Sequence, residues 1–171
     1  MALTNKKALM ILPFRDFEDK EYDIPKRMLE ARGVKVTIAS EHPGELRGTK
    51  GTMARADISL DDVKYSDYDA IVFVGGNGAT RYFDNKTVLK LAKDAKYKIL
   101  GATSNAPVIL ANAEVLKDKR ATGHPSVVGF LRAQKAQYTG QPVEVDEKII
   151  TAQGVSFAET FGNAIIQAIQ K

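Results

Sequence analysis

The sequence predicts an α/β protein, a three-layer sandwich in which a mostly parallel sheet lies between two layers of helices. Two observations predict this fold class. Short apolar runs of the kind found in buried strands alternate, from one end of the chain to the other, with longer segments of helical periodicity. Parallel strands need crossover connections, and helices on both faces of the sheet supply them. No internal repeat, low-complexity tract or linker is visible, so we expect a single domain over residues 1–171.

The expected strands are short runs without a helical period. The segment at 34–40 alternates in polarity and is rich in β-branched residues, which favours a strand. Residues 41–69 are less regular and predict a loop at 42–48 and one or two short strands within 51–60. The clearer strands are expected at residues 7–13, 34–40, 71–76 and 98–104, with a strand–turn–strand unit at 142–154.

The expected helices are longer and amphipathic. In the first, Pro25 predicts a kink or a first-turn position, and Gly33 is a plausible stop. We expect its inward face to carry Tyr22, Ile24, Met28, Leu29 and Ala31, and that of the second helix to carry Val88, Leu89, Leu91, Ala92 and Ala95. The helices are expected at residues 19–33, 85–96, 106–116, 124–134 and 156–171.

Composition excludes several kinds of site. The chain has no cysteine, so disulfides, thiolate catalysis and cysteine-ligated metals are excluded. Its two histidines, His42 and His124, lie far apart and no local ligand spacing is visible, so we expect neither a metal nor a cofactor. The basic residues are dispersed among acidic ones, so we expect no nucleic-acid partner. No apolar run approaches the roughly 20 residues of a membrane span, and the polar N-terminus does not resemble a signal peptide, so we expect a cytoplasmic protein.

The strongest candidate for chemistry is Ser104, in the stretch KILGATSNAPVILANAEVL at residues 98–116. A strand turns there abruptly into a helix, and such a turn exposes a side chain at the N-terminus of the helix. A serine nucleophile needs an adjacent base, and the next residue, Asn105, is not one. Ser104 is therefore either a nucleophile or a helix N-cap.

Three other segments end near the same edge of the expected sheet. Glu18 is either a partly buried proton donor or acceptor, or an acid placed at a helix N-terminus. Gly75 and Gly76 either offer backbone N–H groups to an oxyanion or simply end a strand in a turn. His124 is either a base or a side chain that makes hydrogen bonds within its own loop.

These residues resemble the ThiJ/PfpI superfamily, which has the flavodoxin-like fold of class I glutamine amidotransferases. The similarity covers nearly the whole chain in order, and it points to the branch of PfpI-like intracellular proteases. It is carried by the segments ALMILPFRDFEDKEYDIPKRMLEARGVKVTIAS, DYDAIVFVGGNGATRYFDN, KILGATSNAPVILANAEVLKDKRATGHPSV and IITAQG…FGNAI.

The resemblance implies a role for each candidate. Active members carry Ala-x-Cys-His-Gly-Pro at the elbow, which places Ser104 where the nucleophilic cysteine belongs and Asn105 where the adjacent histidine often sits. The family's buried glutamate matches Glu18 within the segment FEDKE, and its oxyanion glycine matches Gly75 or Gly76. Thr80 falls near the position of an acidic residue that reaches the site of a partner subunit.

The resemblance also implies that His124, in the segment TGHP, lies near the nucleophile. The activities of the family include peptidase, glyoxalase, deglycase and chaperone functions, and the thiol-based ones need the cysteine that this chain lacks.

Three functions follow as hypotheses. The first, which we favour, is a stress-related or ligand-binding homo-oligomer with weak or no thiol-type activity, whose pocket holds a small carbonyl or carboxylate compound. The second is a serine-dependent hydrolase, peptidase-like or glyoxalase/deglycase-like, in which His124 is the base for Ser104 and Glu18 orients it or donates a proton. In this hypothesis the oxyanion is held by the backbone amides near Gly75, Gly76 and Asn105. The third is a purely structural or chaperone-like oligomer.

Overall fold

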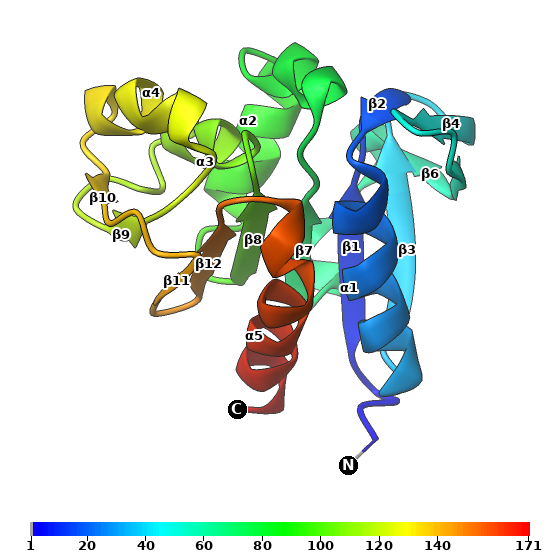
Figure 1. Ribbon diagram of the computed structural model, residues 1–171. Coiled ribbons are helices and arrows are strands. Elements are labelled where there is room, and N and C mark those ends of the chain that lie inside the picture. Colours follow the sequence, from blue (N-terminus) through cyan, green and yellow to red (C-terminus); the bar gives the residue numbers. More distant parts are fainter. Residues whose placement is uncertain (1) are drawn as a thin grey trace.

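The computed structural model describes residues 2–171, and a seven-stranded sheet forms its centre (Figure 1). The strand order is β11-β12-β8-β7-β1-β3-β6. All neighbours pair in parallel except β11 with β12. The carboxyl ends of β1, β7, β8 and β12 therefore lie along one edge. The bounds are β1 Lys7–Ile11, β3 Lys35–Ser40, β6 Ile58–Ser59, β7 Ala70–Phe73, β8 Ile99–Thr103, β11 Val143–Asp146 and β12 Ile149–Ala152.

Helices cover both faces of this sheet, which confirms the predicted α/β sandwich (Figure 1). Alternate residues of β1 show the two layers. Leu9 and Ile11 pack into a core with α2 (Lys86–Asp94) and α3 (Pro107–Asn112), whereas Ala8 and Met10 pack into a core with α1 (Asp19–Ala31) and α5 (Ala158–Gln170). A strand whose successive side chains enter two cores must be apolar where it is buried, and β1 is apolar and buried from Ala8 to Ile11.

Two small sheets flank the main one. β2 (Arg15–Phe17), β4 (Gly44–Gly48) and β5 (Met53–Ala56) form one, and β9 (Arg120–Ala121) pairs with β10 (Gln137–Tyr138) in the other. The loop expected at 42–48 was therefore wrong, because β4 pairs with β5 and buries Leu46 between exposed neighbours. One or two short strands were expected within 51–60, and two are present, β5 and β6.

The helices lie close to the predicted positions, with four differences. Pro25 lies inside α1 rather than in its first turn, and Ala31 is exposed rather than inward. The helix expected at 106–116 ends at Asn112, whose side chain donates to the Phe83 carbonyl at 2.9 Å. The segment 124–134 divides into a 3₁₀ turn and α4 (Val128–Ala133). Within residues 2–171, no helix is both long and apolar enough to cross a membrane.

Candidate functional site

The elbow that follows β8 has the sharp backbone turn expected from the sequence. Ser104 has a φ of +47°, in the left-handed region that residues other than glycine rarely adopt. Its backbone is fixed on both sides, because its N–H donates to the Ala152 carbonyl at 3.0 Å and its carbonyl accepts from the His124 N–H at 2.8 Å. The side chain of Ser104 is half-buried at the carboxyl edge of the sheet.

The side chain that faces Ser104 is Glu21. The Ser104 hydroxyl donates to Glu21 Oε1 at 3.1 Å, and Glu21 is only 2% exposed. Burial raises the pKa of Glu21 to about 7, against the lowering effect of hydrogen bonds from Thr103 and Ser104. The negative charge of Glu18 raises this pKa further. Near neutral pH, Glu21 is therefore a mixture of carboxylic acid and carboxylate.

Glu18, the glutamate that we expected beside Ser104, lies at the start of α1, and its side chain does not face the Ser104 hydroxyl. It is the N-cap of α1, and its carboxylate accepts from the Lys20 N–H at 3.4 Å. Its backbone still belongs to the site, because its N–H donates to the Gly75 carbonyl at 2.8 Å. The sequence does contain a signal for Glu21, which precedes the buried Pro25 by four residues and the buried Leu29 by eight, so all three share the inward face of α1.

The two glycines after β7 lie beside Ser104, but their N–H groups already have partners. The Gly75 N–H donates to Thr103 Oγ1 at 3.1 Å. The Gly76 N–H donates to Asn105 Oδ1 at 3.1 Å, and Asn105 Nδ2 donates back to the Gly76 carbonyl at 2.9 Å. An oxyanion would have to displace these side-chain oxygens before either amide could hold it.

Gly75 also fixes the close approach of the two loops. A Cβ atom at this position would collide with Ser104 Oγ and would lie 2.8 Å from Glu21 Oε1. Only glycine leaves room for the Ser104–Glu21 pair there. At Gly76 the backbone has a φ of +120°, and a Cβ would lie 2.6 Å from the carbonyl oxygen of Asp16.

The His124 side chain is exposed and engaged within its own loop. Its Nδ1 accepts from the Ser126 N–H at 3.1 Å and lies 2.8 Å from Ser126 Oγ. Within the described part of the chain, its only hydrogen bond to Ser104 runs through the backbone. The structure thus brings His124 to the elbow without directing its ring to the Ser104 hydroxyl.

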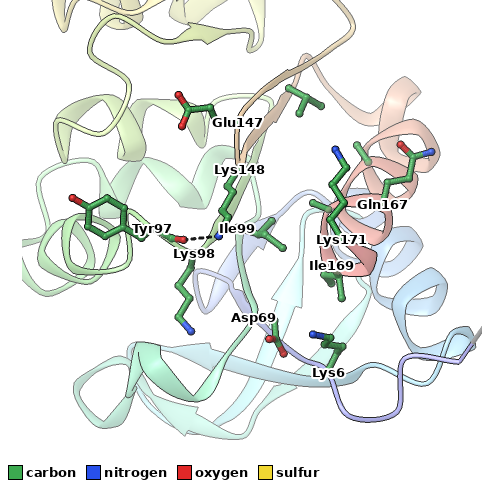
Figure 2. A pocket seen from close by; sticks show the side chains of 13 residues that line it. Lys6, Asp69, Tyr97, Lys98, Ile99, Glu147, Lys148, Gln167, Ile169 and Lys171 are labelled. Carbon is green, nitrogen blue, oxygen red and sulfur yellow. Dashed lines mark hydrogen bonds between the residues drawn. The ribbon is translucent and has the colours of Figure 1, made fainter.

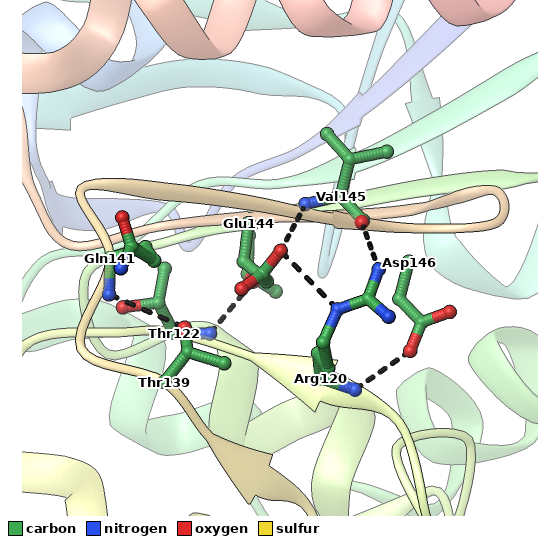
Figure 3. A network of polar contacts seen from close by, with 8 residues as sticks. Arg120, Thr122, Thr139, Gln141, Glu144, Val145 and Asp146 are labelled. Atoms are coloured by element: carbon green, nitrogen blue, oxygen red, sulfur yellow. Dashed lines mark hydrogen bonds and ion pairs between the residues drawn. The ribbon is translucent and has the colours of Figure 1, made fainter.

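The segment that carries His124 is tied to the edge of the sheet by the polar network in Figure 3. The Arg120 N–H donates to Asp146 Oδ2 at 2.8 Å, and the Arg120 guanidinium donates to the Val145 carbonyl at 3.0 Å. A contact of 3.6 Å joins the guanidinium to Glu144. These contacts hold β9 against β11 and so set where the loop after β9 begins.

Thr80, the residue near the family's partner-directed acid, is exposed on the 3₁₀ turn after Gly76, and its hydroxyl donates to the Asn77 carbonyl at 2.9 Å. Among residues 2–171, no group of three histidine, aspartate or glutamate side chains is placed to hold a metal. The arrangement offers hydroxyl and carboxyl chemistry: one half-buried alcohol against one buried acid that can lose its proton near neutral pH.

The chain matches a known family over nearly its whole length. The model of the DJ-1/PfpI family matches residues 6–168. The chain belongs to the DJ-1/PfpI family. The relatives span the chain almost from end to end, so the predicted similarity to ThiJ/PfpI proteins is confirmed along nearly its whole length.

Three members illustrate this similarity. An uncharacterized protein of Methanocaldococcus jannaschii is 36% identical over 99% of this chain and 85% of its own length. A deglycase of Pyrococcus abyssi is 30% identical over 85% of this chain and 89% of its own. The crystal structure of a ThiJ/PfpI domain protein from Brachyspira murdochii superposes with a TM-score of 0.93, at 29% identity and 96% coverage of both chains. Other relatives are named general stress protein, in Bacillus subtilis, and glutathione-independent glyoxalase, in Caenorhabditis elegans.

Proposed function

We propose that this DJ-1/PfpI member is a stress-related protein that binds a small carbonyl or carboxylate compound at Ser104 and Glu21, without thiol-type catalysis. The observation that carries the proposal is the 3.1 Å hydrogen bond between the Ser104 hydroxyl and the buried Glu21 carboxyl, in a chain that has no cysteine. The names of the relatives, deglycase, glyoxalase and general stress protein, support a stress-related role and a ligand with a carbonyl group.

The chemistry of the pair suits such a ligand. A carboxyl group with a pKa of about 7 keeps its proton in about half of the molecules at neutral pH. In that form Glu21 donates a hydrogen bond to a carbonyl or carboxylate oxygen, and the Ser104 hydroxyl both donates and accepts. A hydrogen bond to a charged oxygen is stronger than one between neutral groups, which favours a carboxylate in the ligand.

The serine hydrolase is the weaker hypothesis, since the surroundings of Ser104 do not provide a strong general base or a full set of free oxyanion donors. A hydroxyl needs a general base within about 2.6–3.2 Å, and the ring of His124 is held by Ser126 instead. An oxyanion needs free donors, and two of the three expected amides, those of Gly75 and Gly76, are engaged by side-chain oxygens. The one remaining base is Glu21, whose conjugate acid is far stronger than an alcohol.

Binding of glyoxylate, which carries both an aldehyde and a carboxylate, tests the proposal by titration calorimetry at pH 6.5. Ser104→Ala and Glu21→Leu, which remove the hydroxyl and the carboxyl, are expected to weaken binding about tenfold, the effect of one hydrogen bond to a charged group. Ser126→Ala, the same kind of change at an exposed serine nearby, is the matched control and is expected to bind as the native chain does. Affinity is also expected to fall above pH 7, as Glu21 loses its proton. Unchanged binding in both site variants would overturn the proposal.

A fluorophosphonate probe separates the two hypotheses. We expect no labelling of the native chain, because the base that faces the Ser104 hydroxyl is the Glu21 carboxylate, which is too weak to activate an alcohol. Labelling that Ser104→Ala abolishes and Ser126→Ala leaves intact would instead establish the hydrolase. A homo-oligomer in the cytoplasm is a further prediction, and light scattering after size-exclusion chromatography measures the oligomeric state.

A further inference from the structure

The edge of the sheet opposite the elbow holds a cavity that the proposed function does not use (Figure 2). It has a volume of about 300 Å³ and lies where β8 and β12 begin and α5 ends. Pockets that bind small molecules measure roughly 300–1,000 Å³. This cavity is therefore large enough for a small organic compound rather than only for a simple ion.

The floor of the cavity is apolar. Ile99 and Ile169 are 6% and 3% exposed, and Ala164, Ala168 and Val145 extend the same surface. Figure 2 shows Ile99 between Lys148 on one wall and Lys171 on the α5 side. A fully hydrated ion gains nothing from such a floor, whereas an apolar body that covers it is removed from water.

The rim is basic. Lys6, Lys98, Lys148 and Lys171 line the cavity, and within residues 2–171 none of them lies within 4.0 Å of a carboxylate. Lys148 Nζ instead donates to the carbonyl of Tyr97 at 3.3 Å.

The two acids at this rim have other partners. Asp69 accepts from the backbone N–H of Lys7 at 2.9 Å, and Glu147 forms an ion pair with Lys119 at 2.8 Å. The carbonyl end of α5 contributes only about half a negative charge. The four rim lysines outnumber these two acids, and Glu147 is already paired with Lys119, so the rim has a net positive charge.

We propose that this lysine-rimmed cavity binds a small organic anion with an apolar body, such as a medium-chain carboxylate. The apolar part would cover Ile99 and Ile169, and the carboxylate would lie among the lysine ammonium groups. The rim and the floor are both needed, because the lysine charges attract and orient the anion while the apolar floor buries the apolar part of the ligand. This site is separate from Ser104 and Glu21, so it stands or falls independently of the proposed function.

Octanoate is the probe, and its binding is followed by NMR at the δ1 methyl groups of isoleucine. We expect the signals of Ile99 and Ile169 to shift on titration and that of Ile109, in the core under the other face, to stay unchanged. Octanol, which has the same chain length without the charge, is expected to bind at least tenfold more weakly. Added salt is expected to weaken octanoate binding, since the rim lysines are accessible to solvent.

A pair of double variants tests the role of the rim. Lys98→Gln with Lys148→Gln is expected to weaken octanoate binding about tenfold, since each exposed ion pair contributes a factor of roughly three. Lys64→Gln with Lys86→Gln removes the same charge from exposed positions outside the cavity and is expected to leave binding unchanged. Ser104→Ala is also expected to bind octanoate normally. Equal losses in both double variants, equal binding of octanol, or shifts confined to other methyl groups would overturn the proposal.

Discussion

The pKa of Glu21 makes a quantitative prediction about stability. Burial raises it from an ordinary 4.5 to about 7. Between these two pH values the folded chain keeps a proton that the unfolded chain has released, so stability is fully present below pH 4.5 and is lost as the pH rises through 7. A tenfold change in proton affinity is worth about 1.36 kcal/mol, so the full loss is about 3 kcal/mol. Glu21 is almost completely buried, so solvent screens little of this effect.

Glu21→Gln removes this titration and nearly preserves the shape of the side chain. At pH 4 the variant is expected to be about as stable as the native chain, because both side chains are neutral. At pH 8.5 the native chain carries a buried carboxylate, so the variant is expected to be more stable by about 3 kcal/mol relative to the difference at pH 4.

Urea unfolding of both proteins from pH 4 to 8.5 measures this difference, because the titration of every other group cancels to first order. Glu45→Gln, at an exposed glutamate, controls for the change from acid to amide. A difference between Glu21→Gln and the native chain that stays constant over this range would refute the assignment of Glu21 as a buried acid. So would a carboxyl NMR signal of Glu21 that titrates near pH 4.5.

Substitutions at Ser104, Asn105 and Asp19 test the backbone and the hydrogen bonds around the site. Ser104→Gly is expected to be more stable than Ser104→Ala by about 1 kcal/mol, because glycine adopts a φ of +47° without strain; equal urea midpoints would contradict this. Asn105→Ala is expected to cost about 1–3 kcal/mol of unfolding free energy, since both polar groups of Gly76 lose a partner, and Asn105→Asp, which keeps the acceptor, is expected to cost less. Burial alone would raise the pKa of Asp19, yet hydrogen bonds from the N–H groups of Lys50 and Thr52 lower this pKa overall. The stability that Asp19 contributes is therefore present at neutral pH and is lost as the pH falls through the folded pKa. Amide exchange at 50–52 in Asp19→Asn is therefore expected to be faster than native at pH 7, by a margin that shrinks toward pH 3.

The central strands of the main sheet were predictable because they are buried on both faces. β7 is apolar throughout, and β1 is apolar from Ala8 to Ile11, where it is buried. β4 was missed for the opposite reason. It lies at the margin of the fold, alternates between exposed and buried residues, and has Pro43 and two glycines around it, so its local composition is that of a loop. Its pairing with β5 is a tertiary contact that periodicity does not show.

The candidate site was predictable in place but not in every residue. Abrupt passage from a buried strand to a helix marks Ser104, and paired glycines after a strand mark Gly75 and Gly76. The acid was harder to choose, because Glu18 and Glu21 are one helical turn apart at the start of α1. Glu18 ends as the cap of the helix, and Glu21 faces inward beside Pro25. The partners of the glycine amides, Thr103 and Asn105, were beyond sequence reasoning, since their hydrogen bonds depend on rotamers set by two loops.

The surroundings of Ser104 argue for holding a ligand rather than for turnover. Catalysis at an elbow requires a base for the nucleophile and free donors for the oxyanion, both in place before the substrate arrives. Here the donors of Gly75 and Gly76 are already bound to side-chain oxygens, and the hydroxyl faces an acid that keeps its proton for half of the time at pH 7. Binding of a ligand oxygen requires neither a base nor free glycine amides. The oxygen can accept a hydrogen bond from neutral Glu21 while the hydrogen bonds of the Gly75 and Gly76 N–H groups stay intact. Asn105→Ala separates the two outcomes, because it frees the Gly76 N–H without touching Ser104. If the engaged Gly76 N–H is all that prevents catalysis, this variant will gain fluorophosphonate labelling at Ser104. If Ser104 also lacks a strong base, as we expect, the variant will stay unlabelled.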